Sequence, residues 1–503
     1  MSQLKRNVIA NFVGNFWIGL VSLAFVPLYI HLLGVEAYGL MGLFISLQAL
    51  LSILDLGIST TLNREIARLS ALADAARDMR NLVRTLELIY WGVGAGLGVA
   101  LVALAPFLAH HWLRGEYLSP DALQRAVVLM GIAVGFQWPS SFYSGGLQGL
   151  QRQVLLNLVT AGAATVRAGG AALILWLVSP TIQAFFGWQI MASALQTVAA
   201  GWSLWRCLPE PDYRPTFQHR WVSSVWRFAA GMSGISILAL TLTQLDKLVL
   251  SKALTLQAFG YYTLASTAAY SLYRLIGPVF SAFFPRFSRV VSDGDQASLV
   301  ELYHRGCQLM SVLVLPTALI LALFSREILI LWTGNATLAT ETHLILTLLA
   351  VGTALNGLMN LPYALQLAYG WTQLAFITNL VAVAVLVPLL LWVTSVYGGV
   401  GAAAIWVVLN AGYVLITVQV MHRRLLRGEQ RRWYVEDIGL PLAAAVVTAG
   451  LGRSLITTQS SRFSMLLGIA VVSLLTVAAA AIATPSIRRH MLRAYSQTNA
   501  ARV

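Results

Sequence analysis

The chain contains few charged side chains and very few cysteines. Asp, Glu, Lys and Arg together make up 10% of its 503 residues, whereas hydrophobic residues make up 58%. Soluble domains carry about 25% charged residues, so this composition excludes a soluble globular protein and predicts an all-α polytopic membrane protein. The two cysteines, Cys207 and Cys307, provide neither a disulfide framework nor the ligand spacing of a metal site.

Acidic residues are scarcer than basic ones, with 19 Asp and Glu against 33 Lys and Arg. A basic excess can indicate nucleic-acid binding, but these cations flank apolar segments and form no stripe along one face. We therefore expect membrane lipids, and no nucleic acid, as their partners. The sequence contains no nucleotide-binding loop, nucleophile elbow or metal motif in a suitable context, so we expect neither an enzyme nor a cofactor.

Long apolar runs divide the chain into about fourteen membrane-spanning helices. A span needs about 20 apolar residues. The first run is too long for the core of a cleavable signal, so we expect it to be retained. The loops that carry clustered Lys and Arg fall on one side of this arrangement, which the positive-inside rule assigns to the cytoplasm together with both termini. The expected spans are 7–32, 39–61, 85–112, 122–147, 154–178, 182–206, 229–253, 260–285, 304–325, 342–367, 374–396, 400–421, 438–456 and 463–484.

One sequence motif occurs twice. Residues 33–40 (LGVEAYGL) recur as residues 254–261 (LTLQAFGY), with an offset of 221 residues. The same offset places Gly149 opposite Gly370, each at the inner end of the fourth helix in its half. This agreement predicts two pseudo-symmetric six-helix lobes. The predicted domains are an N-terminal lobe 1–206, a cytoplasmic linker 207–228, a C-terminal lobe 229–421, and a segment 422–503 with a cytoplasmic loop, two further helices and a basic tail.

Three cations, Arg167, Lys247 and Arg274, lie inside otherwise apolar spans. A charge at mid-bilayer costs about 2.5–3.5 kcal/mol on insertion scales, so it usually faces a bundle interior or a watery cavity. Fixed positive charge in such a cavity favours an anionic cargo. Each cation also has a structural interpretation: Arg274 could pair with Asp246, Lys247 could extend toward the interface, and Arg167 lies on a helix with a weaker polar face.

Polar side chains recur at helical spacing on several spans, which places them on one face of each helix. Such residues often join helices by hydrogen bonds, but their presence in corresponding helices of both halves favours a shared polar cavity. Two carboxylates, Asp246 and Asp55, are candidates for ion coupling or for a structural role, and Asp55 could cap a helix or meet Arg64. The candidate cavity residues are Gln244, Tyr270, Asn356, Asn360, Asn11 and Asn15, with further stripes at Gln48, Ser52, Ser59, Gln137, Ser141 and Asn157.

Several stretches carry a family resemblance through their order and spacing. They are 25–40, 54–58, 64–67, 244–247, 258–261, 278–285, 331–334 and 360–363, with Gln366 and Gly370. Together they resemble the O-antigen and lipid-linked oligosaccharide flippases of the multidrug/oligosaccharidyl-lipid/polysaccharide (MOP) exporter superfamily. The resemblance covers about residues 1–420. The last two helices resemble the extra pair of the lipid II flippases.

The resemblance implies a MATE-like fold, in which two lobes enclose a central cavity that opens alternately to each side. It implies a cargo of undecaprenyl-pyrophosphate-linked oligosaccharide, moved from the inner to the outer leaflet of the bacterial cytoplasmic membrane. Arg167, Lys247 and Arg274 would then contact the pyrophosphate, and polysaccharide polymerase machinery would be a further partner. The alternatives are a multidrug cation exporter, which would want buried carboxylates in the first lobe, and a membrane polysaccharide polymerase or ligase, which would want a large outer loop.

Overall fold

The computed structural model describes residues 3–55, 57–72, 75–210, 212–222, 244–456, 461–485 and 488. Within these ranges every regular element is a helix, as the composition predicts. Nine of the helices in this part of the chain are long and apolar enough to cross a membrane. Residues 229–243 of the expected seventh span, the last part of the expected linker and the basic C-terminal tail lie outside the described residues.

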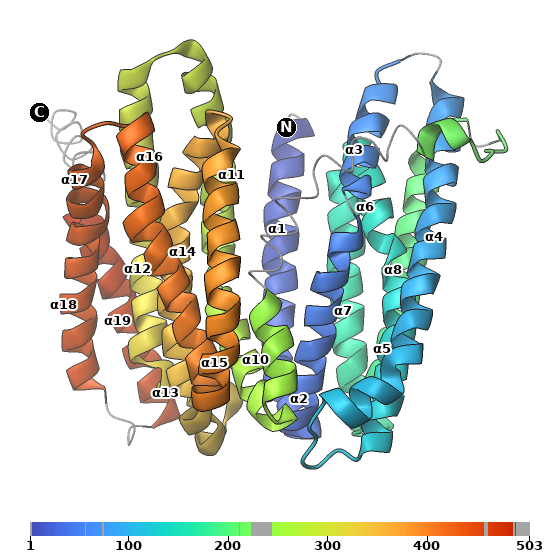
Figure 1. The fold of residues 1–503 in the computed structure, drawn as a ribbon, viewed down its shortest axis with the longest axis horizontal. Helices are drawn as coiled ribbons and strands as arrows, with labels where there is room; N and C mark the ends of the chain where they lie inside the picture. The colour runs from blue at the N-terminus through green and yellow to red at the C-terminus, as the bar shows by residue number, and fades with distance from the viewer. Residues whose placement is uncertain are drawn as a thin grey trace, which may run out of the picture. The chain divides into compact units, whose positions relative to one another are not determined.

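The chain divides into two compact units, Met1–Gly260 and Tyr261–Val503. In the first unit most of the long helices run nearly parallel (Figure 1). Its elements are α1 (Gln3–Ala24), α2 (Val26–Leu51), η1 (Ser52–Asp55), α3 (Ile58–Leu69), α4 (Ala76–Phe107), η2 (Leu108–Trp112), α5 (Pro120–Gln137), α6 (Pro139–Gly149), α7 (Gln153–Leu177), α8 (Ile182–Cys207), helical residues 244–253, and the beginning of α10 (Leu256–Tyr270).

The second unit is also a helical bundle, and its buried core lies where α11, α12 and α14 meet the segment that follows α15. Phe283, Phe287, Tyr303 and Trp433 belong to this core. Its elements are the rest of α10, α11 (Tyr273–Asp293), α12 (Gln296–Leu323), α13 (Ser325–Thr333), α14 (Ala336–Ala368), α15 (Thr372–Gly412), η3 (Tyr413–Thr417), α16 (Val418–Leu425), α17 (Gln430–Arg432), η4 (Trp433–Gly439), α18 (Leu440–Leu455) and α19 (Arg462–Ala483).

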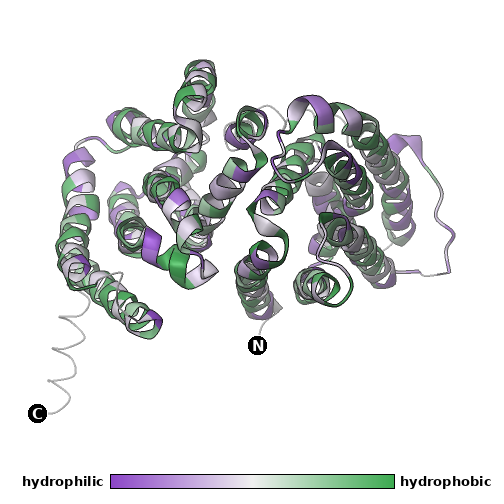
Figure 2. Ribbon diagram, turned by 90° about the horizontal axis from the view of Figure 1, so that it is seen from below, coloured by the Kyte–Doolittle hydropathy of each residue, from purple (hydrophilic) through white to green (hydrophobic). Residues whose placement is uncertain are grey.

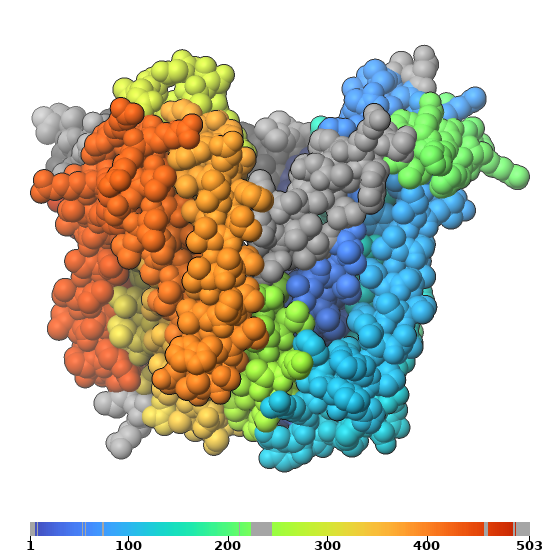
Figure 3. Space-filling model, viewed as in Figure 1, coloured from blue at the N-terminus to red at the C-terminus, as the bar shows by residue number. Residues whose placement is uncertain are grey.

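The outward faces of the helices are apolar. Hydrophobic and hydrophilic residues are mixed along the ribbon of both units (Figure 2), and α15 presents a long outer face in the space-filling view (Figure 3). On α15 the side chains of Ile377, Val381, Val385 and Trp392 are each more than half exposed. A continuous exposed apolar surface of this kind is expected where a helix faces lipid.

Two glycines divide helices that look continuous. Gly34 in α2 has φ 84° and Gly398 in α15 has φ 57°, a backbone conformation that favours glycine. Each break falls between two expected spans: Gly34 lies between the spans 7–32 and 39–61, and Gly398 lies between the spans 374–396 and 400–421. The sequence therefore predicts these helix boundaries within a few residues.

The expected span 260–285 is not one continuous helix, because a break divides it into α10 and α11. The α-helical pattern stops at Ser271 and Leu272, whose backbone N–H groups donate to the carbonyls three residues earlier at 3.3 and 3.2 Å. The Ser271 hydroxyl also donates to the Ala268 carbonyl at 2.7 Å, a local bond that competes with the regular helix. Arg274 consequently lies in the first turn of α11 and not in the middle of a helix.

The two copies of the repeated motif pack against each other through glycines. A Cβ atom on Gly39 would lie 2.3 Å from the carbonyl oxygen of Leu256, and a Cβ atom on Gly260 would lie 2.3 Å from that of Val35. Since Val35 and Gly39 become Leu256 and Gly260 under the offset of 221, the two contacts are reciprocal. This reciprocity is what a local two-fold relation between the motifs produces.

A loop after α4 binds both motifs. The Glu36 carboxylate, which is buried, accepts backbone N–H groups of Glu116, Tyr117 and Leu118 at 2.8, 2.8 and 3.3 Å. The first N–H of α10, at Leu256, donates to the carbonyl of Arg114 at 2.8 Å. The loop 114–118 therefore holds the two glycine-packed helices together by main-chain hydrogen bonds.

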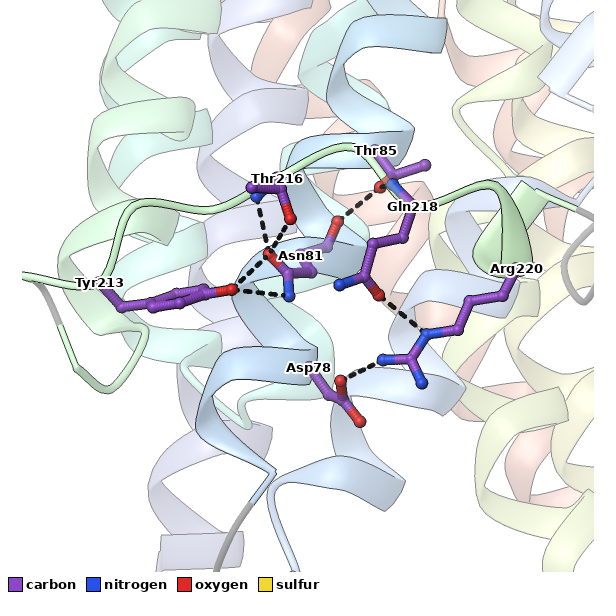
Figure 4. Close-up of polar contacts among 7 residues, drawn as sticks. All are labelled: Asp78, Asn81, Thr85, Tyr213, Thr216, Gln218 and Arg220. Atoms are coloured by element: carbon purple, nitrogen blue, oxygen red, sulfur yellow. Dashed lines mark hydrogen bonds and ion pairs between the residues drawn. The ribbon is translucent and has the colours of Figure 1, made fainter.

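The chain after α8 crosses back over the N-terminal part of α4 as a strap, residues 208–210 and 212–222 (Figure 4). The amide oxygen of Asn81 accepts the backbone N–H of Thr216 at 2.8 Å, and its amide nitrogen donates to the Tyr213 hydroxyl at 3.1 Å. The Thr85 hydroxyl accepts the N–H of Gln218 at 3.0 Å. Asn81 is buried and makes two of these three hydrogen bonds, so we expect it to contribute most to the path of the strap.

We expect Gly39→Ala and Gly260→Ala each to destabilise the protein by about 1–3 kcal/mol, because the new methyl group meets a main-chain oxygen that a rotamer change does not move. The melting temperature in detergent measures this. Gly92→Ala on α4, where no atom lies within 4 Å of the added Cβ, is the control and should be neutral or slightly stabilising. Equal melting temperatures for Gly39→Ala and Gly92→Ala would contradict the contact.

We expect Asn81→Ala to release the strap and to accelerate tryptic cleavage after Arg220 several-fold, because Trp221 is buried against the bundle in the folded strap. The rate is followed by gel electrophoresis of the native protein. Arg77→Gln removes an exposed ion pair to Glu210 and a cation–π contact with Tyr213, so it should accelerate cleavage much less than Asn81→Ala does. Unchanged cleavage in Asn81→Ala would show that other contacts fix the strap.

Candidate functional site

A polar cavity of about 460 Å³ lies within the first unit. It is formed by the end of α2, η1, the junction of α5 with α6, and the start of α3. The stripes expected on the second and fourth spans contribute most of its polar groups. Its lining residues are Gln48, Leu51, Ser52, Asp55, Ser59, Val134, Gln137, Trp138, Ser140 and Ser141.

Arg167 is connected to this cavity by a hydrogen bond to Gln137, which lines it. The Nη2 atom of Arg167 on α7 donates to the side-chain oxygen of Gln137, and to that of Gln196 at 2.8 Å. The Ser193 hydroxyl also donates to the Gln137 oxygen, at 2.9 Å. Arg167 is thus held among α5, α7 and α8 by neutral oxygens, and these described contacts leave its positive charge without a carboxylate.

A second, apolar cavity of about 330 Å³ lies between α7 and α8. Gln196, which binds Arg167, is the polar member of its lining, while the side chains around it are aliphatic or glycine. One guanidinium therefore contacts two glutamines, of which one lines a polar cavity and the other an apolar one. The apolar cavity is lined by Leu158, Val159, Gly162, Ala163, Val166, Ala192, Leu195, Gln196 and Ala199.

Asp55 is fixed by hydroxyl groups. Its Oδ2 atom accepts from the Ser59 hydroxyl at 2.7 Å, and its Oδ1 atom accepts from the buried Tyr90 hydroxyl. Arg64, a possible partner in the sequence interpretation, instead pairs with Glu65 at 2.8 Å. Burial raises the pKa of Glu65, but hydrogen bonds from Arg64 and Arg68 outweigh it, so the pKa lies below its usual value.

The other sequence candidates lie in three places. Gln244, Asp246 and Lys247 are partly buried in the helical segment 244–253 of the first unit, whereas Arg274 is exposed on α11 of the second unit. Arg167 and Lys247 therefore belong to one unit and Arg274 to the other.

Several of the asparagines join helices. The Asn157 amide on α7 donates to the Asn11 oxygen on α1 at 2.5 Å, and Asn15 is exposed on α1. In the second unit the Asn356 amide donates to the Asn410 oxygen at 2.8 Å, which ties α14 to α15. The Asn360 amide donates to the Asn356 carbonyl at 2.8 Å.

Aromatic hydroxyls and rings complete the cluster around Asn356. The Tyr273 hydroxyl donates to the Asn356 side-chain oxygen at 3.1 Å. The Tyr270 ring packs against those of Tyr273 and Trp406, with centroids 5.8 and 6.3 Å apart. The amide groups of this cluster are therefore engaged in packing α10, α11, α14 and α15.

Sequence reasoning missed two buried ionisable clusters. Glu87 on α4 accepts from the Tyr143 hydroxyl at 2.7 Å, the Trp205 indole N–H at 2.9 Å and Arg84 at 3.0 Å. On α12, His304 lies between Asp437 and Glu429. An acidic residue next to an apolar run was the available signal in both places, but both lie at the ends of spans, where charges normally reach water.

The family model "Polysaccharide biosynthesis protein" matches residues 30–339, more than half of the chain. A Shigella flexneri protein named "Putative O-antigen transporter" is 22% identical over 407 residues, which cover 80% of this chain and 94% of that protein.

Solved structures show the same fold at low sequence identity. The lipid II flippase MurJ in an inward closed conformation superposes with a TM-score of 0.69 at 13% identity, covering 95% of this chain and 98% of MurJ. An inward-facing multidrug resistance MATE transporter of the MOP superfamily gives 0.66 at 12% identity, covering 81% and 96%. The Vibrio cholerae MATE transporter VcmN gives 0.57 at 15% identity, covering 84% and 96%. The chain therefore belongs to the polysaccharide biosynthesis protein family and has the fold of the MurJ and MATE transporters of the MOP superfamily.

Proposed function

We propose that this protein is a flippase, and no enzyme, which moves an undecaprenyl-pyrophosphate-linked oligosaccharide from the inner to the outer leaflet of the bacterial cytoplasmic membrane. The observation that carries the proposal is the position of Arg167. Its guanidinium joins Gln137, which lines a polar cavity, to Gln196, which lines an apolar one. A lipid-linked sugar has the matching order of parts: polar sugar, anionic pyrophosphate and hydrocarbon chain.

The chemistry of each part supports this assignment. Amide and hydroxyl side chains such as Gln48, Ser52 and Ser141 both donate and accept hydrogen bonds, as sugar hydroxyls require. Arg presents several N–H donors in a planar fork that fits phosphate oxygens. Because Gln137 and Gln196 are neutral, an arriving anion would supply the only negative charge in this set of described contacts.

We extend the proposal to the remaining predicted features. Lys247 and Arg274 are further cationic contacts for the cargo during its passage, and both termini face the cytoplasm, in agreement with the positions of the basic loops. The family membership and the O-antigen transporter relative support a role before polymerisation, with polysaccharide polymerase machinery as a functional partner.

Asp55 provides a reason to keep a second candidate function, export of cationic drugs. This carboxylate lines the polar cavity of the first unit, where a cation exporter of this fold would want one. Its two oxygens are already engaged by Ser59 and Tyr90. We therefore favour the anionic cargo, and the transport experiment below includes a cationic dye.

Arg167→Ala should reduce flipping more than tenfold. A hydrogen bond to a charged group contributes about 1.5–3 kcal/mol, and about 1.4 kcal/mol corresponds to a factor of ten. The rate is measured in proteoliposomes as the appearance of undecaprenyl-pyrophosphate oligosaccharide accessible to an added lectin. Arg167→Lys keeps the charge and should retain part of the activity.

Arg125→Ala is the matched control, because Arg125 is exposed on α5 and its one hydrogen bond to the described residues goes to the backbone carbonyl of Asp121. If Arg167→Ala flips its cargo at the wild-type rate, Arg167 does not bind the anion of the cargo. If the cationic dye moves and no polyprenyl-pyrophosphate sugar does, the flippase proposal is wrong and the protein is a drug exporter.

We expect water to fill the polar cavity. In a background in which Cys207 and Cys307 are replaced by alanine, Ser52→Cys and Ser141→Cys should react with a small water-soluble thiol reagent, because both side chains are exposed in the cavity. Ser193→Cys, at a fully buried position beside Gln137, is the control and should stay unreacted. Equal protection at all three positions would mean that side chains or lipid fill this space.

A further inference from the structure

His304 on α12 lies between two carboxylates of the segment that precedes α18. Its Nδ1 atom is 2.6 Å from Oδ2 of Asp437, and its Nε2 atom is 3.0 Å from Oε2 of Glu429. The side chains of His304 and Asp437 are 2% and 0% exposed, whereas that of Glu429 is 27% exposed. Glu429 is therefore the exposed member of the cluster.

A neutral histidine and two carboxylates together hold one proton too few to make both contacts hydrogen bonds. A neutral imidazole has a single N–H, so it donates to one carboxylate and turns a lone pair toward the other. Two lone pairs at 2.6 or 3.0 Å repel each other. Both contacts become hydrogen bonds only if the imidazole carries a second proton or if one carboxylate is protonated.

The neighbouring groups stabilise the cluster but do not provide this proton. On α12, Gln308 donates to the other Asp437 oxygen at 2.8 Å. On the segment that carries Glu429, Arg432 lies 3.6 Å from Glu429 and 3.3 Å from Glu436. Arg432 cannot supply the proton, because a guanidinium is not deprotonated in proteins. Glu436 does not contact His304 in these described contacts.

The second histidine nearby, His422 on α16, is occupied elsewhere. Its Nδ1 atom faces the Val418 carbonyl at 2.9 Å and must donate to it, which leaves Nε2 to accept from the Tyr303 hydroxyl at 3.3 Å. This arrangement describes a neutral imidazole. The other titratable groups packed here are Tyr303 and Cys307 on α12 and Tyr434 on η4. The contribution of α11 is the apolar ring of Phe287 against Tyr303.

The geometry does not suit a metal ion. Asp437 and Glu429 approach opposite nitrogens of one ring, so their oxygens cannot converge on a common centre. Among the described residues, no group of three His, Cys, Asp or Glu is arranged to hold a metal.

The backbone at Asp437 is itself unusual. Asp437 lies in η4, a seven-residue π-helical segment, and π-turns occur frequently at functional sites. Glu429 follows Gly428, whose φ is +89°. The two carboxylates thus come from a π-helix and from a tight turn, 8 residues apart, and both point to one imidazole.

We propose that His304, Asp437 and Glu429 form a proton-binding site that holds the C-terminal helix pair, α18 and α19, against α12. The proton enters and leaves at Glu429, which is the exposed member of the cluster. Loss of the proton places a lone pair against a carboxylate, and the Glu429 turn is the part free to move away. This site goes beyond the proposed function, because it does not depend on the cargo.

The proton can be counted directly. At pH 8 an unfolded chain holds these groups as neutral histidine and two carboxylates. Denaturing the protein with SDS in weakly buffered detergent solution should therefore release one proton from this site, measured with a pH electrode. Asp437→Asn and Glu429→Gln should each release one proton fewer than wild type, because an amide N–H supplies the missing donor permanently.

Glu436→Gln is the matched control, since it neutralises a neighbouring carboxylate that does not contact His304, and it should release as many protons as wild type. Glu429 is partly exposed, so Glu429→Gln keeps the test decisive if Asp437→Asn fails to fold. If Asp437→Asn or Glu429→Gln releases the same number of protons as wild type, the proton site does not exist.

The same site makes stability depend on pH. The folded protein binds the additional proton and the unfolded chain does not, so the folded state loses stability as pH rises, by about a factor of ten in the unfolding constant per pH unit. The melting temperature of wild type and Glu436→Gln should fall more steeply between pH 7 and 9 than that of Glu429→Gln. If the melting temperatures of wild type and Glu429→Gln change with pH in parallel, the proton-binding site is wrong. A failure of flipping in liposomes would contradict the proposed function and leave the proton-binding site unaffected.

Discussion

The structure depends on one constraint: polar groups inside an apolar helical bundle must find their partners within the protein. Each buried charge described above meets this constraint in its own way. Arg167 uses two glutamine oxygens, Glu36 uses three backbone N–H groups, and His304 uses two carboxylates. An unsatisfied polar group costs several kcal/mol where no water is available. The positions of these clusters therefore determine how the helices can rotate and slide against one another.

The constraint also separates structural polar residues from those available to a cargo. The Asn11–Asn157 and Asn356–Asn410 pairs use their amide groups on each other and so join helices. Gln137 differs, because it binds Arg167 and also lines a cavity. A polar stripe on a membrane helix is thus a site only where some of its groups still face open space.

Much of the fold follows from the sequence because helix length and apolarity are local properties. The apolar runs predict the helices, and the offset of 221 residues identifies the two motifs whose glycines Gly39 and Gly260 then meet. The break at Ser271 was not predictable, since neither glycine nor proline marks it and a side-chain hydrogen bond causes it. The partners of Arg167 and His304 were not predictable either, because they come from segments 29 to 133 residues away and depend on how each helix is rotated.

The reciprocal glycine contact limits how the two copies of the motif can diverge. Most close contacts in a protein core tolerate drift, because a larger side chain on one element is offset by a smaller one opposite. Here each glycine faces a main-chain carbonyl oxygen. A smaller side chain on the opposite helix would not move that oxygen, so it would not make room for a Cβ atom in place of the glycine. Divergence can alter the neighbours, as Glu36 and its counterpart Gln257 show, but it has to leave both glycines in place.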